Sequence, residues 1–73
     1  MHSVTGTTRL YGLVGDPLRT AKSPQLLNQL FASQGVDAVC VPLIVPAGDL
    51  ASFVRGARVM RNLSGVLVTM PHK

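Results

Sequence analysis

The sequence predicts an α/β fold with the element order β-α-β-α-β, in which a mainly parallel, open sheet is flanked by helices. The first observation behind this prediction is that apolar segments of strand length alternate with segments whose apolar residues recur at helical spacing. The second is that short connections join these segments. Strands that alternate with helices form parallel sheets with right-handed crossovers. A chain of 73 residues has room for one such small domain.

Turn and cap signals mark the first strand and the first helix. Residues 9–15 form an apolar segment that ends at the turn signal Gly15-Asp16-Pro17. Ser23 is the expected N-cap of the helix, because a serine hydroxyl can accept a hydrogen bond from an unpaired backbone N–H. Gly35 supplies the stop signal. The apolar residues that predict the buried side of this helix are Leu26, Leu27, Leu30 and Phe31.

The second half of the chain repeats the pattern. Residues 36–45 are expected to form the second strand, and Pro42 indicates an edge position or a bulge, because proline lacks a ladder N–H. The second helix is expected to open at residues 46–49. The third strand is predicted at residues 66–70, after a turn at residues 62–65. The buried stripe of the second helix is predicted to be Leu50, Phe53, Val54 and Ala57. Residues 1–8 are polar and predict a loose tail ahead of the domain at residues 9–73.

Composition and charge argue against several classes of protein. The net charge is +4, but Arg55, Arg58 and Arg61 recur as on a solvated helix face, and no aromatic residues interleave with them. No nucleic-acid partner is therefore expected. No apolar run is long enough to span a membrane, and the N-terminus lacks a signal-peptide layout, so we expect a cytoplasmic protein without a membrane partner. The single cysteine, Cys40, is expected in the core, and His72 has no companion ligands for a metal site.

Polar residues follow the first and third strands, where a binding site is expected. In a parallel sheet the carboxyl ends of the strands meet at one edge, and open α/β sheets bind ligands in the crevice beyond that edge. Ser23 brings a hydroxyl and a helix N-terminus, which favours anions. Thr69 adds a second hydroxyl at the end of the third strand, and Lys73 adds a positive charge just after Pro71 has ended that strand. This arrangement predicts a small anionic ligand, such as a carboxylate.

Three stretches resemble the N-terminal substrate-binding domain of shikimate dehydrogenases, a family that includes quinate/shikimate dehydrogenase-like proteins. They are the Gly-Asp-Pro-Leu…Lys-Ser-Pro segment at residues 15–24, the Val-Pro-Leu…Pro…Asp-Leu segment at residues 41–50, and the Gly-x-x-Val-Thr-x-Pro-His-Lys ending at residues 65–73. The ending is the most specific of the three. The resemblance covers nearly all of the chain from about Arg9 onward.

The resemblance implies NADP-dependent interconversion of 3-dehydroshikimate and shikimate, or of a related hydroxy acid, in the pathway to chorismate and the aromatic amino acids. It implies that Lys73 is the catalytic acid/base group, beside an aspartate further along a full-length chain. Ser23 then helps to hold the substrate carboxylate, and Thr69 contacts a ring hydroxyl. The implied partner is a small anionic hydroxy acid, shikimate- or quinate-like. NADP belongs to a full-length parent, and none is expected on this chain, because no Gly-x-Gly-x-x-Gly occurs in it.

Two departures from the family pattern bear on the substrate. Ala21 stands where the family has its first carboxylate-binding serine, and Leu67 stands where it has an asparagine. Loss of a hydrogen bond to a charged group costs about 1.5–3 kcal/mol, so another hydroxy acid is expected to fit better than shikimate.

The chain is expected to be the front part of an enzyme, truncated after the motif lysine and inactive alone. The alternative is a stand-alone non-catalytic remnant or a small-carboxylate-binding module. An open sheet edge also predicts self-association.

Overall fold

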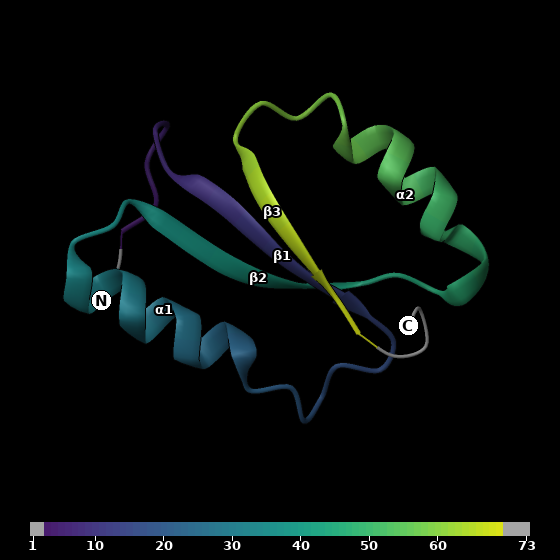
Figure 1. Ribbon diagram of the computed structural model, residues 1–73, viewed down its shortest axis with the longest axis horizontal. Helices are drawn as coiled ribbons and strands as arrows, with labels where there is room; N and C mark the ends of the chain where they lie inside the picture. Colours follow the sequence, from purple (N-terminus) through teal and green to yellow (C-terminus); the bar gives the residue numbers. More distant parts are fainter. Residues whose placement is uncertain (1–2, 70–73) are drawn as a thin grey trace.

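The structure, a computed structural model, describes residues 3–69 of the chain. Within these residues the strands and helices follow one another in the predicted order (Figure 1). They are β1 (Arg9–Gly15), α1 (Ser23–Gln34), β2 (Ala38–Ile44), the 3-10 helix η1 (Ala47–Asp49), α2 (Leu50–Ala57) and β3 (Leu63–Val68). The predicted α/β fold class is confirmed.

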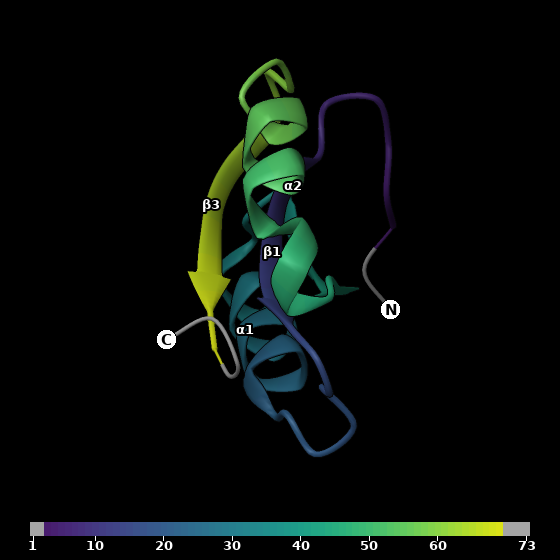
Figure 2. The ribbon, with the colours of Figure 1, turned by 90° about the vertical axis from the view of Figure 1, so that its right-hand side faces the viewer.

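The three strands of the described residues form one parallel sheet in the order β2-β1-β3. β1 is the central strand, and Figure 2 shows β3 at an outer edge of the sheet. β2 forms the other edge, which confirms the edge position that Pro42 predicted. The pairing of β1 with β3 shifts register between Leu10 and Tyr11, where β3 carries one extra residue.

The core lies mainly between the sheet and α1. Leu13, Leu18 and Cys40 are its buried centre, and Cys40 is 2% exposed, as its predicted core position requires. The partly buried residues that pack around this centre are Tyr11, Ala21, Leu27 and Phe31. The rings of Tyr11 and Phe31 have centroids 5.4 Å apart, within the range of favourable aromatic pairs. Half of the predicted stripe of α1 therefore faces the core, while Leu26 and Leu30 are exposed.

The side chain of Asn28 ties α1 to the edge strand β2. Its amide nitrogen donates to the carbonyl oxygen of Cys40 at 2.9 Å, and its amide oxygen accepts from the Cys40 N–H at 2.7 Å. These are the two backbone groups that a further strand would otherwise bond. The amide of Asn28 thus takes the place of a neighbouring strand at that position.

Three local predictions need correction. The helix α1 begins at Ser23, so Lys22 is the N-cap residue and no side chain caps the helix; the prediction of Ser23 as N-cap was wrong. β3 begins at Leu63 rather than at residue 66, because the predicted turn at residues 62–65 partly pairs with β1. No residue of the predicted α2 stripe is buried, because all four of its residues line a cavity between α2 and β3. The end of α1 is as predicted, with Gly35 in the left-handed region at φ 68°.

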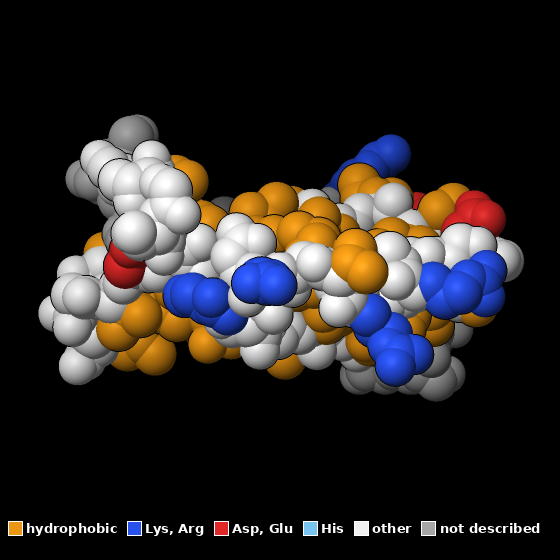
Figure 3. Space-filling model, turned by 90° about the horizontal axis from the view of Figure 1, so that it is seen from above, with side chains coloured by type: hydrophobic (Ala, Val, Ile, Leu, Met, Phe, Trp, Pro, Cys, Tyr) orange, Lys and Arg blue, Asp and Glu red, His pale blue; other side chains and the backbone are white. Residues whose placement is uncertain are grey.

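The first residues that the structure describes are held against the loop before β2. The hydroxyl of Thr7 donates to a carboxylate oxygen of Asp37 at 2.6 Å, and the hydroxyl of Thr8 donates to the other oxygen at 2.8 Å. Thr8 is 4% exposed. The face in Figure 3 shows lysine and arginine side chains in several separate places, with hydrophobic side chains exposed between them.

Candidate functional site

The carboxyl ends of the strands meet at one edge of the sheet, as expected for a parallel arrangement. In the register, Val14 of β1 pairs with Val68 of β3, and Gly15 pairs with Ile44 of β2. The backbone N–H of Thr69 then donates to the carbonyl oxygen of Val14 at 2.9 Å. The loop at residues 16–22 leaves β1 at this same edge (Figure 1). The sequence prediction that the β1–α1 loop and the end of β3 share an edge is therefore confirmed.

Ser23 presents a hydroxyl at the N-terminus of α1. As the first residue of the helix it is half-buried, and within residues 3–69 its hydroxyl makes no hydrogen bond. The helix lacks a side-chain cap, while Leu26 already donates its N–H to the carbonyl of Lys22. The remaining amides of the first turn carry the positive end of the helix dipole. This helix start therefore offers a hydroxyl and partial positive charge to an anion.

Thr69 lies at the end of β3 and is half-buried. Its backbone is held by Val14, while its hydroxyl makes no hydrogen bond within the described part of the chain. Lys73, the predicted catalytic residue, lies outside the described residues. The structure therefore places Thr69 against the end of β1 and Ser23 at the far end of the loop that leaves β1, and it says nothing of the third predicted residue.

The β1–α1 loop is fixed by an apolar anchor and carries its charges outward. Leu18 is 9% exposed and belongs to the core, whereas Arg19 and Lys22 are exposed. Asp16, also exposed, precedes Pro17 in a cis peptide bond. The two cations outnumber the one anion, so the loop favours an anionic ligand.

Ala21 packs its methyl group against the core cluster. The sequence alone did not predict this packing contact, because the resemblance indicated only that Ala21 lacks the hydroxyl of the family's serine. Ala21 therefore contributes to packing and not to binding. The hydroxyls at this edge of the sheet are those of Ser23 and Thr69.

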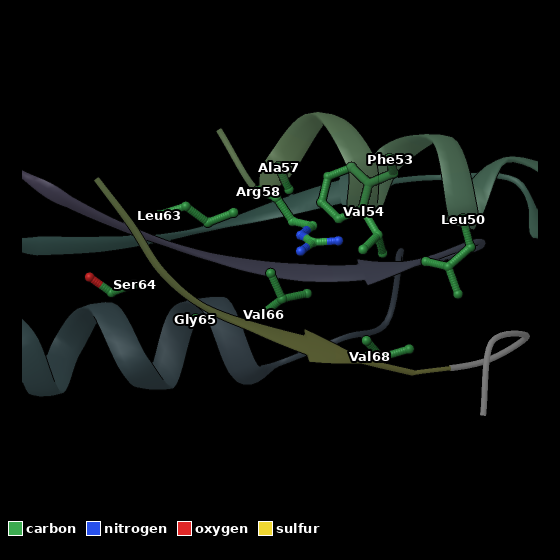
Figure 4. A pocket seen from close by; sticks show the side chains of 10 residues that line it. All are labelled: Leu50, Phe53, Val54, Ala57, Arg58, Leu63, Ser64, Gly65, Val66 and Val68. Atoms are coloured by element: carbon green, nitrogen blue, oxygen red, sulfur yellow. The ribbon is translucent and has the colours of Figure 1, made fainter. Parts of the chain in front are cut away.

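A cavity of about 320 Å³ lies elsewhere, between α2 and β3. Figure 4 shows it between the helix above and the strand below, with Phe53 and Val54 from α2 facing Val66 from β3. The guanidinium of Arg58 is the one charged group among its lining residues in the described chain. Sequence reasoning missed this cavity because it assigned the apolar residues of α2 to a buried stripe.

Cys40 shows no feature of a reactive thiol. It is buried, and burial raises the pKa of its thiol above the usual range because the thiolate loses hydration. Among residues 3–69, no group of three side chains is arranged to hold a metal ion. None of the helices in that part of the chain is long and apolar enough to cross a membrane.

Comparisons with known proteins agree with this fold and this edge. The family described as the shikimate dehydrogenase substrate binding domain matches residues 13–73. The NADP(+) shikimate dehydrogenase of Rubrobacter xylanophilus is 46% identical over 70 residues, and that of Anaeromyxobacter dehalogenans is 44% identical over the same length. Each alignment covers 96% of this chain but only 24% and 25% of those relatives.

Solved structures give the same picture. A shikimate 5-dehydrogenase from Listeria monocytogenes, in complex with shikimate and NAD, superposes with a TM-score of 0.90 at 40% identity, covering 100% of this chain and 25% of that one. A shikimate dehydrogenase in complex with NADP+ also gives a TM-score of 0.90, at 31% identity over 97% of this chain and 24% of that one. The chain thus spans about a quarter of the length of these relatives, and it belongs to the shikimate dehydrogenase family through its substrate-binding domain.

Proposed function

We propose that this chain supplies part of the binding site for a small anionic hydroxy acid, shikimate- or quinate-like, in an oxidoreductase of the shikimate dehydrogenase type. The observation that carries the proposal is the 2.9 Å hydrogen bond between Thr69 and Val14, which sets the end of β3 beside the end of β1. The β1–α1 loop starts at that point and leads to Ser23, whose hydroxyl makes no hydrogen bond within residues 3–69. Two hydroxyls and a positive helix end are suited to a carboxylate that carries ring hydroxyls.

Each residue has a distinct task in this proposal. Ser23 donates its hydroxyl to the substrate carboxylate, with help from the amides of the first turn of α1. Thr69 bonds a ring hydroxyl through its own hydroxyl, since its backbone N–H is already engaged. Lys73 takes up the proton of the reacting hydroxyl, a step that oxidation of an alcohol requires. The soluble substrate and the single, buried cysteine support a cytoplasmic location.

NADP does not fit the described residues of this chain. A dinucleotide pyrophosphate needs a glycine-rich turn between a strand and a helix, so that the backbone can approach it closely. The β1–α1 loop at residues 16–22 holds no glycine, and the side chains of Leu18 and Ala21 fill its inner side. We therefore propose that NADP is held by other residues of a longer polypeptide, and that the 73-residue chain alone has no dehydrogenase turnover.

The lack of fit between the described residues and NADP also supports a second candidate function. A chain that binds a small carboxylate but cannot hold the dinucleotide is a non-catalytic carboxylate-binding module, or a remnant of an enzyme. An assay of NADPH production by the protein as its native gene encodes it distinguishes these two functions. An enzyme produces NADPH from shikimate or quinate, whereas a module binds the acid without turnover.

The test is a titration of the 73-residue chain with shikimate and with quinate. Binding is measured from the changes in the NMR chemical shifts of the backbone amides. We expect millimolar binding with shifts centred on Ser23 and Thr69. Ser23→Ala and Thr69→Val should each weaken it about tenfold, since loss of a hydrogen bond to a charged or polar partner costs about 1.5 kcal/mol. Ser33→Ala is the matched control, because this hydroxyl bonds Leu30 near the other end of α1.

Two results contradict the proposal. If Ser23→Ala and Thr69→Val bind the acids as tightly as Ser33→Ala does, the carboxyl edge of the sheet is not the binding site. If the purified 73-residue chain produces NADPH from shikimate, the assignment of the dinucleotide to other residues is wrong.

A further inference from the structure

The helix α1 rests on the sheet mainly through apolar contacts. It runs alongside the edge strand β2 (Figure 1). None of its residues is fully buried, and it contributes the partly buried side chains of Leu27 and Phe31 to the core. The hydrophobic effect depends on the apolar area removed from water and has no direction of its own. These contacts therefore hold α1 on the sheet, but they constrain its position along β2 only weakly.

Asn28 supplies the directional contact between α1 and the sheet. Its amide nitrogen donates to the Cys40 carbonyl at 2.9 Å, and its amide oxygen accepts from the Cys40 N–H at 2.7 Å. Hydrogen bonds weaken steeply when their distance and angle leave a narrow range. Among residues 3–69, no other side chain of α1 hydrogen-bonds to the sheet. The two bonds of Asn28 therefore set the position of α1 along β2.

Ser23 shares this helix and moves with it. Fewer than two turns separate Ser23 from Asn28, and no glycine lies between them. A shift of the helix at Asn28 is therefore passed on to the Ser23 hydroxyl. A hydroxyl bonds its partner only within about 2.5–3.0 Å, so a shift of about 1 Å is enough to break such a contact.

We propose that Asn28 is a positioning residue for the hydroxy acid. It sets the distance between the hydroxyls of Ser23 and Thr69, so that one molecule can engage both. This inference rests on the proposed function, which assigns the substrate carboxylate to Ser23 and a ring hydroxyl to Thr69. The backbone of Thr69 is held by Val14 of β1, and β1 pairs with β2 along its whole length. By bonding Cys40 of β2, Asn28 ties the Ser23 hydroxyl to the same sheet that holds Thr69.

The variant Asn28→Ala removes both bonds and tests this role. It is made in a Gly56→Ala background, because nothing lies within 4 Å of the new Cβ at residue 56 and alanine stabilises the interior of α2. Circular dichroism checks that the variant is folded. The dissociation constants of shikimate and quinate are measured from the chemical shifts of the backbone amides. We expect Asn28→Ala to raise them about five- to tenfold, close to the effect of Ser23→Ala.

A double-mutant cycle separates positioning from a general loss of stability. If Asn28 acts through the Ser23 hydroxyl, Asn28→Ala should not weaken binding further once Ser23→Ala has removed that hydroxyl. A general loosening of the fold weakens binding in both backgrounds. Thr8→Val is the matched control, because it removes a buried hydroxyl that bonds Asp37 beyond the opposite end of β1. We expect this control to lower stability and to leave both dissociation constants unchanged.

Asn28→Gln is a second variant that keeps the amide. Its longer side chain places the amide one C–C bond, about 1.5 Å, further from the helix. The amide then cannot make both bonds to Cys40 unless α1 moves. We expect a folded chain in which shikimate and quinate bind at least threefold more weakly than in the wild type. Unchanged binding in Asn28→Gln overturns the positioning role, and this variant decides the matter if Asn28→Ala does not fold.

The outcomes of the cycle are distinct. Weaker binding in Asn28→Ala that disappears in the Ser23→Ala background supports the positioning role. Unchanged binding in Asn28→Ala, or equal weakening in both backgrounds, overturns it while the proposed function stands. If Ser23→Ala itself leaves binding unchanged, the proposed function fails, and the role of Asn28 fails with it.

Discussion

Replacing Asn28 with alanine removes the pair of hydrogen bonds between α1 and the edge strand β2. The amide of Asn28 bonds the N–H and the carbonyl of Cys40 at 2.7 and 2.9 Å, and each such bond contributes about 0.5–1.5 kcal/mol. Alanine regains about 0.7 kcal/mol through its higher helix propensity. We therefore expect Asn28→Ala to lower the free energy of unfolding by about 0.3–2.3 kcal/mol.

Urea unfolding followed by circular dichroism measures this loss. For a chain of this size the denaturant slope is about 1 kcal/mol/M, so the midpoint should fall by about 0.3–2.3 M. Gln29→Ala is the control. Gln29 is exposed on the same helix, so its replacement by alanine changes only the helix propensity. If Asn28→Ala unfolds at the same urea concentration as Gln29→Ala, the two hydrogen bonds do not stabilise the fold.

The variant Asn28→Asp adds a pH dependence of known sign. Its carboxylate still accepts from the Cys40 N–H, but its second oxygen faces the Cys40 carbonyl, which repels it. Protonation restores a donor, so the pKa of this carboxyl is raised in the folded state. The stabilising contribution is thus full below the unfolded pKa of about 3.9 and is lost as pH rises through the folded pKa. Stability relative to the wild type, measured by urea unfolding at each pH, should be higher at pH 3.5 than at pH 7. The opposite trend contradicts the assigned contacts.

Three further changes test the packing. Burial raises the pKa of the Cys40 thiol, so the stabilising contribution of this thiol is present below the ordinary thiol pKa and is lost as pH rises through the folded value. Urea unfolding at alkaline pH should therefore show a smaller loss of stability in Cys40→Ala than in the wild type. Gly65→Ala should lower stability by about 1–3 kcal/mol in the same assay, because the new Cβ meets the Tyr11 ring at 3.1 Å. Gly56→Ala should raise the thermal midpoint and add about 1 kcal/mol, since the position is inside α2 and nothing lies within 4 Å of the new Cβ. A neutral Gly65→Ala or a destabilising Gly56→Ala contradicts the described packing.

The sequence predicted the elements whose signals are local. β1 ends at its Gly-Asp-Pro turn, and α1 stops at Gly35, whose left-handed conformation most residues adopt only with strain. The start of β3 depends on a distant contact. Gly65 resembles a turn residue, yet the Tyr11 ring lies only 3.1 Å from the place a Cβ would take, so the glycine serves close packing inside a strand.

The candidate site was predictable in its location and not in its details. Strand order along a parallel sheet places Thr69 and the β1–α1 loop at one edge whatever the loop conformation is. The state of the Ser23 hydroxyl depends on whether the helix begins one residue earlier or later, and propensities do not resolve that difference. The bonds of Asn28 to Cys40 carry no sequence signal, because a polar residue at mid-helix usually faces solvent.

The contacts that fix the site are made by groups other than the hydroxyls proposed to bind substrate. Asn28 holds α1 to β2 five residues after Ser23, which is only about 7.5 Å along the helix axis at 1.5 Å per residue. The backbone of Thr69 is held by Val14. Both hydroxyls therefore belong to anchored backbone and make no hydrogen bond of their own within residues 3–69. A hydroxy acid that binds here meets hydroxyls carried by backbone that is already anchored, so little backbone entropy is lost on binding.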